Sequence, residues 1–127
     1  MRHAYCRSDF RFREYCYWIP AGLFYLERYE KLSLRACFLY GYLLHAQILA
    51  GTEDKNGYMS VRYPKRALTR ILRCSQKEVG ETLTELSEKG AGLISYQDEK
   101  EDKLRIYVRD YTRPILPPRA RRKAGIR

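Results

Sequence analysis

Apolar positions recur at helical spacing in three segments of the chain. The longest, about 33–50 ("SLRACFLYGYLLHAQILA"), opens at Ser33, a residue type that caps helix starts well, and is apolar on almost every side. The pattern therefore predicts a central, buried helix. Its expected inner face is formed by Leu39, Leu43 and Ala46, with Phe38, Tyr42 and Leu44 on the flanks.

The next two helical segments follow each other with only a short break. The segment "PKRALTRILR" (64–73) predicts a helix that begins at Pro64 and buries Ala67, Leu68, Ile71 and Leu72. Ser75, followed three residues later by Glu78, is a capping-box pattern and predicts a new helix starting at Ser75. Val79, Leu83 and Leu86 should be buried, and Gly90 and Gly92 should end this helix. Two helices joined in this way form a helix–turn–helix, whose common use is to hold the second helix against DNA.

Alternating apolar and polar residues predict strands on both sides of these helices. The expected strands are 14–20, 58–63, 92–97 and 104–111, with a helical turn over 21–31. The charged run "DEKEDK" (98–103) joins the last two strands into a hairpin. The order of elements is that of a winged helix. We therefore predict an α+β fold, a winged helix-turn-helix with a small antiparallel sheet and a β-hairpin wing.

More than half of the net positive charge lies in the C-terminal segment of the chain. The chain carries a formal charge of +10, and residues 112–127 contain six basic residues and no acid. This Pro-interrupted segment is typical of a disordered tail that attracts any polyanion. We predict an N-terminal arm (1–13), a winged-helix domain (14–111) and a basic tail (112–127). Because the predicted domain is only mildly basic, the charge total by itself does not identify its partner.

Composition argues against several classes of function. No apolar run approaches the roughly 20 residues that cross a bilayer, and the N-terminus lacks a signal-peptide pattern, so a cytoplasmic location is expected. The four cysteines lack the close pairing typical of zinc sites and are expected to be reduced thiols. Two distant histidines do not suit metal-assisted DNA nicking by tyrosine, and no Gly-rich nucleotide loop is present. We therefore expect neither an enzyme nor a cofactor.

The candidate DNA-binding residues lie on the helix–turn–helix and on the hairpin. Gln76 suits adenine and Lys77 suits guanine in the major groove, whereas Ser75 either caps only or also touches DNA. Glu81 and Thr84 are weaker candidates on the same helix. Cations on the outer face of the preceding helix either hold phosphates, which position a protein without specifying sequence, or are solvated. The candidate cations are Lys65, Arg66, Arg70 and Arg73 on that helix and Lys100, Lys103 and Arg105 on the hairpin.

Several motifs together resemble the N-terminal domain of the replication initiator protein A family. They are "YWIPAGLFYLERYEKLSLRACFLYGYLLHAQIL", "KNGYMSVRY", "VGETLTELSEKGAGLISY" and "IYV", which extend over about 14–111. These proteins initiate theta replication of plasmids and related elements in Gram-positive bacteria. The resemblance implies a winged helix that binds double-stranded DNA repeats at a plasmid origin, usually as a homodimer. It also implies that host replication proteins are engaged only through a C-terminal domain, which is absent from these 127 residues.

Two features depart from the family pattern. The wing "DEKEDK" is acidic where family wings are often basic, so phosphate contact by the wing is in question. The second helix of the pair carries four glutamates, of which Glu85 and Glu88 are expected to face solvent or another subunit. Two alternatives to an initiator stay open, a winged-helix transcriptional regulator and a winged helix used as a protein-interaction module. The N-terminal aromatic residues either form a dimer surface or cover the domain's own core; they are Phe10, Phe12, Tyr15, Tyr17 and Trp18.

Overall fold

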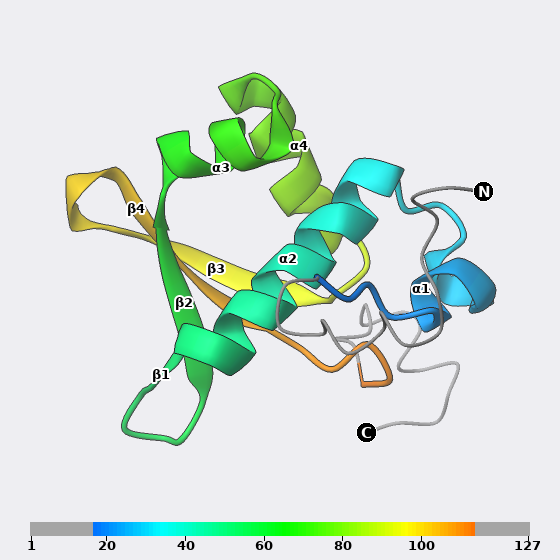
Figure 1. The fold of residues 1–127 in the computed structure, drawn as a ribbon, viewed down its shortest axis with the longest axis horizontal. Coiled ribbons are helices and arrows are strands. Elements are labelled where there is room, and N and C mark those ends of the chain that lie inside the picture. Colours follow the sequence, from blue (N-terminus) through cyan, green and yellow to red (C-terminus); the bar gives the residue numbers. More distant parts are fainter. Residues whose placement is uncertain (1–16, 114–127) are drawn as a thin grey trace, which may run out of the picture.

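A computed structural model describes residues 17–113 and shows helices packed on a small sheet (Figure 1). The predicted arm (1–13), the first part of the predicted 14–20 strand and the tail beyond 113 lie outside the described residues. The helical elements are α1 (Gly22–Tyr25), η3 (Glu27–Tyr29), α2 (Leu34–Ala50), α3 (Lys65–Leu72), α4 (Gln76–Leu86) and η4 (Lys100–Asp102). The strands are β1 (Thr52–Glu53), β2 (Met59–Pro64), β3 (Ile94–Glu99) and β4 (Lys103–Val108).

The four strands form one antiparallel sheet in the order β1-β2-β4-β3. Val61 on β2 pairs with Ile106 on β4, and Ile94 on β3 pairs with Val108 on β4. The β3–β4 hairpin is the predicted wing, and α3 and α4 lie beside it at one end of the sheet (Figure 1). The α+β class and the winged-helix arrangement are therefore confirmed. The two-residue strand β1 was not predicted, because so short an edge strand has no periodicity to detect.

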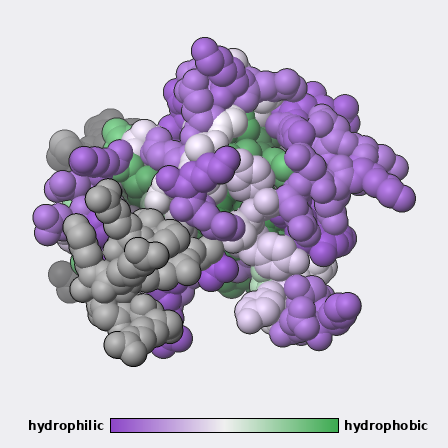
Figure 2. Space-filling view, turned by 180° about the vertical axis from the view of Figure 1, so that it is seen from behind, coloured by the Kyte–Doolittle hydropathy of each residue, from purple (hydrophilic) through white to green (hydrophobic). Residues whose placement is uncertain are grey.

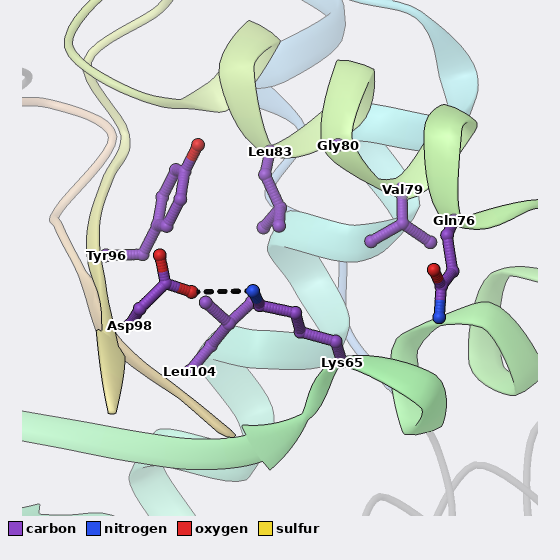
Figure 3. A pocket seen from close by; sticks show the side chains of 8 residues that line it. All are labelled: Lys65, Gln76, Val79, Gly80, Leu83, Tyr96, Asp98 and Leu104. Carbon is purple, nitrogen blue, oxygen red and sulfur yellow. Dashed lines mark ion pairs between the residues drawn. The ribbon is translucent and has the colours of Figure 1, made fainter. Parts of the chain in front are cut away.

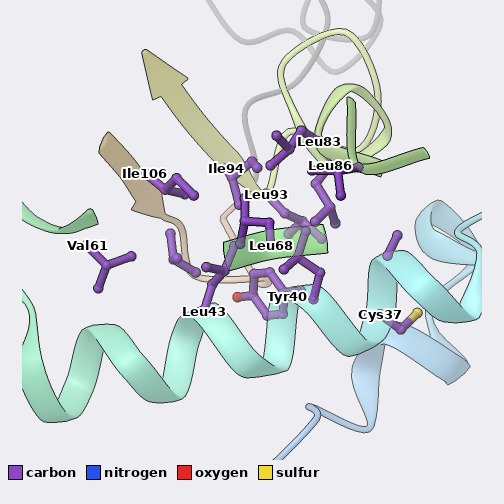
Figure 4. Close-up of a cluster of buried hydrophobic side chains, with 14 of the residues drawn as sticks. Cys37, Tyr40, Leu43, Val61, Leu68, Leu83, Leu86, Leu93, Ile94 and Ile106 are labelled. Carbon is purple, nitrogen blue, oxygen red and sulfur yellow. The ribbon is translucent and has the colours of Figure 1, made fainter. Parts of the chain in front are cut away.

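Helix α2 crosses the sheet and supplies more core residues than any other element. Ser33 caps it as predicted, its hydroxyl oxygen accepting a hydrogen bond from the Ala36 N–H at 3.1 Å. The side chains of α2, α3, α4 and the strands converge on one apolar cluster (Figure 4). Its completely buried members include Leu39, Tyr40, Leu43, Leu68, Leu86, Leu93, Ile94 and Ile106.

Helix α2 is a central helix, as predicted, but its two ends are exposed. Residues 36–47 are almost all buried or half-buried, because the sheet and α4 cover one side of the helix and the Trp18–Ile19 segment lies close to another. Leu34 near its start and Ile48 and Leu49 near its end are 76%, 72% and 69% exposed. The apolar pattern therefore predicted the burial of the middle of the helix correctly and overestimated the burial of its ends.

Two side chains of α2 and one of η3 bind the backbone at the C-terminal end of the domain. The side-chain amide of Gln47 donates to the Val108 carbonyl at 3.2 Å, and its oxygen accepts from the Val108 N–H at 2.9 Å. This amide takes the place of a neighbouring strand at the end of β4. The hydroxyls of Tyr40 and Tyr29, the latter from η3, donate to backbone carbonyls of Arg109 and Tyr111 respectively.

The described part of the predicted 14–20 strand is not a strand. Residues 17–20 make no sheet ladder. Instead, the Tyr17 ring packs on α2, with its centroid 4.8 Å from that of Tyr42 and 4.9 Å from that of His45. The alternating aromatic pattern is satisfied here by rings lying on a helix, which requires no strand partner.

The helix–turn–helix is confirmed, with shifts of a few residues at the ends. Pro64 is the last residue of β2 and the N-cap of α3, so the helix begins at Lys65, one residue later than predicted. Helix α3 ends at Leu72, and its C-cap Arg73 adopts the left-handed conformation (φ 52°, ψ 48°) and turns the chain toward α4. Helix α4 ends at Leu86, because Ser87 already leaves helical geometry, and not at Gly90.

Two further features concern membranes and metals. Within residues 17–113, no helix is both long enough and apolar enough to cross a bilayer. In the same range, no group of three or more His, Cys, Asp or Glu side chains is arranged to hold a metal ion. Cys37 is buried in α2, as expected of a small apolar side chain, and Cys74 lies half-buried in the turn; neither is in a disulfide.

Candidate nucleic-acid interface

The first turn of α4 is built by a capping box. The Ser75 hydroxyl oxygen accepts from the Glu78 N–H at 3.2 Å. In return, the Glu78 carboxylate accepts from the Ser75 N–H at 3.2 Å and from its hydroxyl at 3.1 Å. These bonds satisfy amides that a helix start leaves free. The box was predicted from spacing alone and is confirmed.

Helix α4 presents one polar face to solvent. Its buried side consists of Val79, Thr82, Leu83 and Leu86, as its apolar spacing predicted for three of the four. The outward positions are all exposed; they are Gln76, Lys77, Gly80, Glu81 and Thr84. The start of α4 therefore offers an amide, an ammonium group and a carboxylate from consecutive helical turns, which is the kind of donor and acceptor set that reads base edges.

Two of the four glutamates in α4 are used inside the domain. The second carboxylate oxygen of Glu78 makes an ion pair with Arg35 at 2.8 Å. Glu85 accepts a hydrogen bond from the Ser33 N–H at 2.7 Å. The expectation that Glu85 faces solvent or another subunit is therefore wrong. Residues seven apart lie on the same side of a helix, and here that side faces the start of α2, where a carboxylate is favourable.

These contacts fix α4 against α2. The hydrogen bonds from Ser75, followed by the charge of Arg35, lower the pKa of Glu78, so this carboxylate stays ionised well below neutral pH. Arg35 had not been singled out from the sequence, because it lies 43 positions from Glu78. Glu81 remains as the acid on the outward face of α4. Glu88, which follows the helix, is exposed as expected.

The cations of α3 divide into two groups. Arg66, Arg70 and Arg73 are exposed and make no ion pair with residues 17–113. Lys65 is partly exposed, with 42% of its side chain accessible, but its ammonium group is paired. Its ammonium group lies 2.8 Å from Asp98 and 3.6 Å from Asp102 on the wing, and the bond to Asp98 raises its pKa. Lys65 therefore joins α3 to the wing, and three arginines form the free basic face.

The wing neutralises most of its own charge. Glu99 bridges Arg62 at 2.8 Å and Arg105 at 3.0 Å, and Lys103 lies 3.6 Å from Glu101. Two of the three predicted wing cations are thus engaged within the domain. Lys100 at the tip is exposed and makes no ion pair with the described residues. The wing acids that depart from the family pattern are partners for nearby cations.

A groove separates α4 from the wing. It has a volume of about 290 Å³, with one wall formed by α4 and the opposite wall by β3. Figure 3 shows Tyr96, Asp98 and Leu104 on one side of the groove and Gly80 and Leu83 on α4 on the other, with the Lys65 side chain reaching Asp98. Figure 2, which views the molecule from behind, shows a mostly polar face with small apolar areas exposed between polar side chains. Sequence reasoning had not singled out Tyr96, because a tyrosine in a strand is ordinary.

Comparison with known protein families identifies the family of this chain. Residues 15–116 match the family described as the N-terminus of replication initiator protein A (RepA). The chain belongs to this family. The resemblance inferred from its motifs is therefore confirmed. The comparison with curated proteins gave no match.

Solved structures share the fold of this RepA N-terminal domain. One, titled "Structure of MDR initiator", has a TM-score of 0.64 at 20% identity and covers 98% of this chain and 100% of that one. A second, "N-Terminal domain of DNA binding protein", has a TM-score of 0.63 at 21% identity over 98% and 94%. A third, "Structure of Rep-DNA complex", has a TM-score of 0.61 at 22% identity over 96% and 93%.

In this RepA N-terminal domain, some of the predicted DNA-binding residues are exposed and others are held in ion pairs. Eight of the predicted residues are exposed on the adjacent helices α4 and α3 or at their caps; they are Ser75, Gln76, Lys77, Glu81, Thr84, Arg66, Arg70 and Arg73. Lys65, Lys103 and Arg105 are held in ion pairs within the domain, and Lys100 lies apart at the wing tip. Their roles in DNA binding stay predictions.

Proposed function

We propose that this domain binds double-stranded DNA with the first two turns of α4 in the major groove, and that it recognises the origin of a plasmid-type replicon. The observation that carries the proposal is the exposed polar face of α4, whose start is rigidly capped and lies next to three exposed arginines on α3. Membership in the replication initiator family supports it, as does the shared fold with a protein solved as a Rep–DNA complex.

The two helices would contribute different parts of the binding free energy. Arg66, Arg70 and Arg73 would contact phosphates, so affinity would fall steeply with salt. Gln76, Lys77 and Glu81 would contact base edges, where each good bidentate contact contributes about 1–3 kcal/mol of discrimination. The internal ion pairs of the wing support a smaller role for the wing in binding phosphates.

We also propose that the domain binds DNA repeats as a homodimer and acts by binding, not by catalysis. Trp18 and Tyr25, 58% and 84% exposed, are apolar surface of the kind that interfaces bury. Burial raises the pKa of Tyr29, Tyr40 and Tyr63, which disfavours the phenolate form of these three residues.

The test begins with selection of duplexes by the full chain from a random pool, followed by footprinting. A repeated or symmetric consensus supports the initiator dimer, and preference for promoter fragments over origin repeats favours the transcriptional regulator. Charge reversals then locate the surface. Arg70→Glu should weaken all duplexes and reduce the salt slope by about 1, whereas Lys77→Glu should in addition reduce discrimination between sites.

Lys55→Glu is the matched control, because Lys55 is exposed at the turn between β1 and β2, at the other end of the sheet from α3 and α4 (Figure 1). Its charge change is the same, and DNA affinity should stay close to wild type. Equal losses in all three variants would contradict the proposed surface. A chain that binds no duplex at all would favour the protein-interaction module, for which the exposed wing acids Asp98 and Glu101 are the supporting observation.

A further inference from the structure

Gly80 is the glycine for which the fold of residues 17–113 gives no reason. An added Cβ at Gly22, Gly41, Gly51 or Gly90 would approach another atom closer than 3.0 Å. Gly57 and Gly92 have φ of 84° and 71°, which other residues rarely adopt. Gly80 lies in the middle of α4, has no positive φ, and an added Cβ would meet nothing within 4 Å. A glycine here weakens the helix without serving the packing of the free domain.

Gly80 borders the groove between α4 and β3, so its missing side chain leaves the helix backbone open to that groove (Figure 3). On the opposite wall lies Tyr96, which is 37% exposed. Val79, Leu83 and Leu104 line the groove between them. The groove thus combines an apolar floor with neutral donors, the Tyr96 hydroxyl and the Gln76 amide, at its rim.

The charges at the rim limit what the groove can hold. The ammonium group of Lys65 is already shared by Asp98 and Asp102. No unpaired cation lines the groove within the described part of the chain, so a free, highly charged anion is poorly matched to it. A deoxyribose ring with its phosphates at the margin fits better, because the sugar contacts apolar side chains and a phosphate oxygen accepts from neutral hydroxyls and amides.

We propose that Gly80 and Tyr96 form a subsite for one sugar–phosphate strand of the bound duplex. This inference rests on the proposed function, since a helix lying in the major groove is flanked by two such strands. One of them would pass between α4 and the wing, over the uncovered backbone at Gly80. The Tyr96 hydroxyl would donate to a phosphate oxygen. The absence of a side chain at position 80 would serve this close approach.

The test uses opposite effects on stability and on binding. Gly80→Ala should raise the melting temperature of the free chain by roughly 2–5 °C, because alanine is the better helix former. The same variant should bind the selected duplex about 5- to 100-fold more weakly, the range expected for one methyl group forced into a packed contact. The salt slope should not change, because no charge is altered.

Tyr96→Phe should weaken binding about 2- to 10-fold with an unchanged melting temperature, since only one exposed hydroxyl is lost. Its matched control is Tyr58→Phe, because Tyr58 is also exposed, at 66%, but lies on the distant β1–β2 hairpin. If Gly80→Ala and Tyr96→Phe bind like wild type while Lys77→Glu is weakened, the subsite is refuted and the proposed function stands. If none of these variants changes duplex binding, both are overturned.

Discussion

Replacing Ser75 by alanine tests whether the capping box determines where α4 begins. The hydroxyl is the acceptor for the Glu78 N–H at 3.2 Å and a donor to its carboxylate at 3.1 Å. Alanine removes both bonds, and neither group is buried, so water replaces them in part. Loss of a serine N-cap costs about 0.5–2 kcal/mol, typically about 1 kcal/mol. For a chain of this size, we expect the melting temperature to fall by roughly 2–5 °C.

Urea unfolding followed by far-UV circular dichroism measures this change as a lower midpoint at an unchanged slope. Ser75→Asn is the matched variant, because an asparagine side chain caps helices about as well as serine. Ser75→Asn should therefore unfold close to wild type. A wild-type midpoint for Ser75→Ala, or equal destabilisation by the two variants, would refute the capping argument.

The same pair separates capping from DNA contact. If the Ser75 hydroxyl only caps, Ser75→Asn restores duplex affinity together with stability. If the hydroxyl also touches DNA, Ser75→Asn restores stability but leaves affinity reduced. Binding measured well below the melting temperature of each variant keeps unfolding out of the comparison.

Two further predictions concern stability. Gln47→Leu should lower the free energy of unfolding by about 1–3 kcal/mol, because the N–H and carbonyl of Val108 lose their side-chain partner. The Val108 amide hydrogen should then exchange faster with solvent. A wild-type exchange rate would contradict this role of Gln47. Burial raises the pKa of Tyr63 from 10.0 to about 12 and also raises that of Tyr40, so the unfolded chain loses phenolic protons at lower pH than the folded chain. These two groups should therefore leave stability unaffected below pH 10 and lower it from pH 10 toward 12. In urea titrations, Tyr63→Phe should make this fall in stability smaller. An equally steep fall in the variant would argue against the role of Tyr63.

Long-range contacts account for the main errors of the sequence-based predictions. Glu85 was expected outside and instead binds the Ser33 N–H, 52 positions away. Lys65 was expected to be an outward cation available to DNA, and its partly exposed ammonium group instead pairs with Asp98. The aromatic alternation at Tyr17 was interpreted as a strand, although its ring packs on α2. Each of these side chains has a partner on another element, and the spacing of its own segment carries no information about that partner.

The sequence by itself determined the family, the two helices with the capping box between them, the buried face of α4 and the β3–β4 hairpin. These features depend on residues three, four or seven positions apart, or on strand alternation, so the local pattern specifies them. Only the tertiary structure decided that Arg35 and Glu85 join α2 to α4, that the wing acids occupy their own cations, and that Gly80 faces Tyr96 across a groove. The docking of separate elements brings these groups together, and that docking follows from how all the apolar faces are buried at once, not from any one segment.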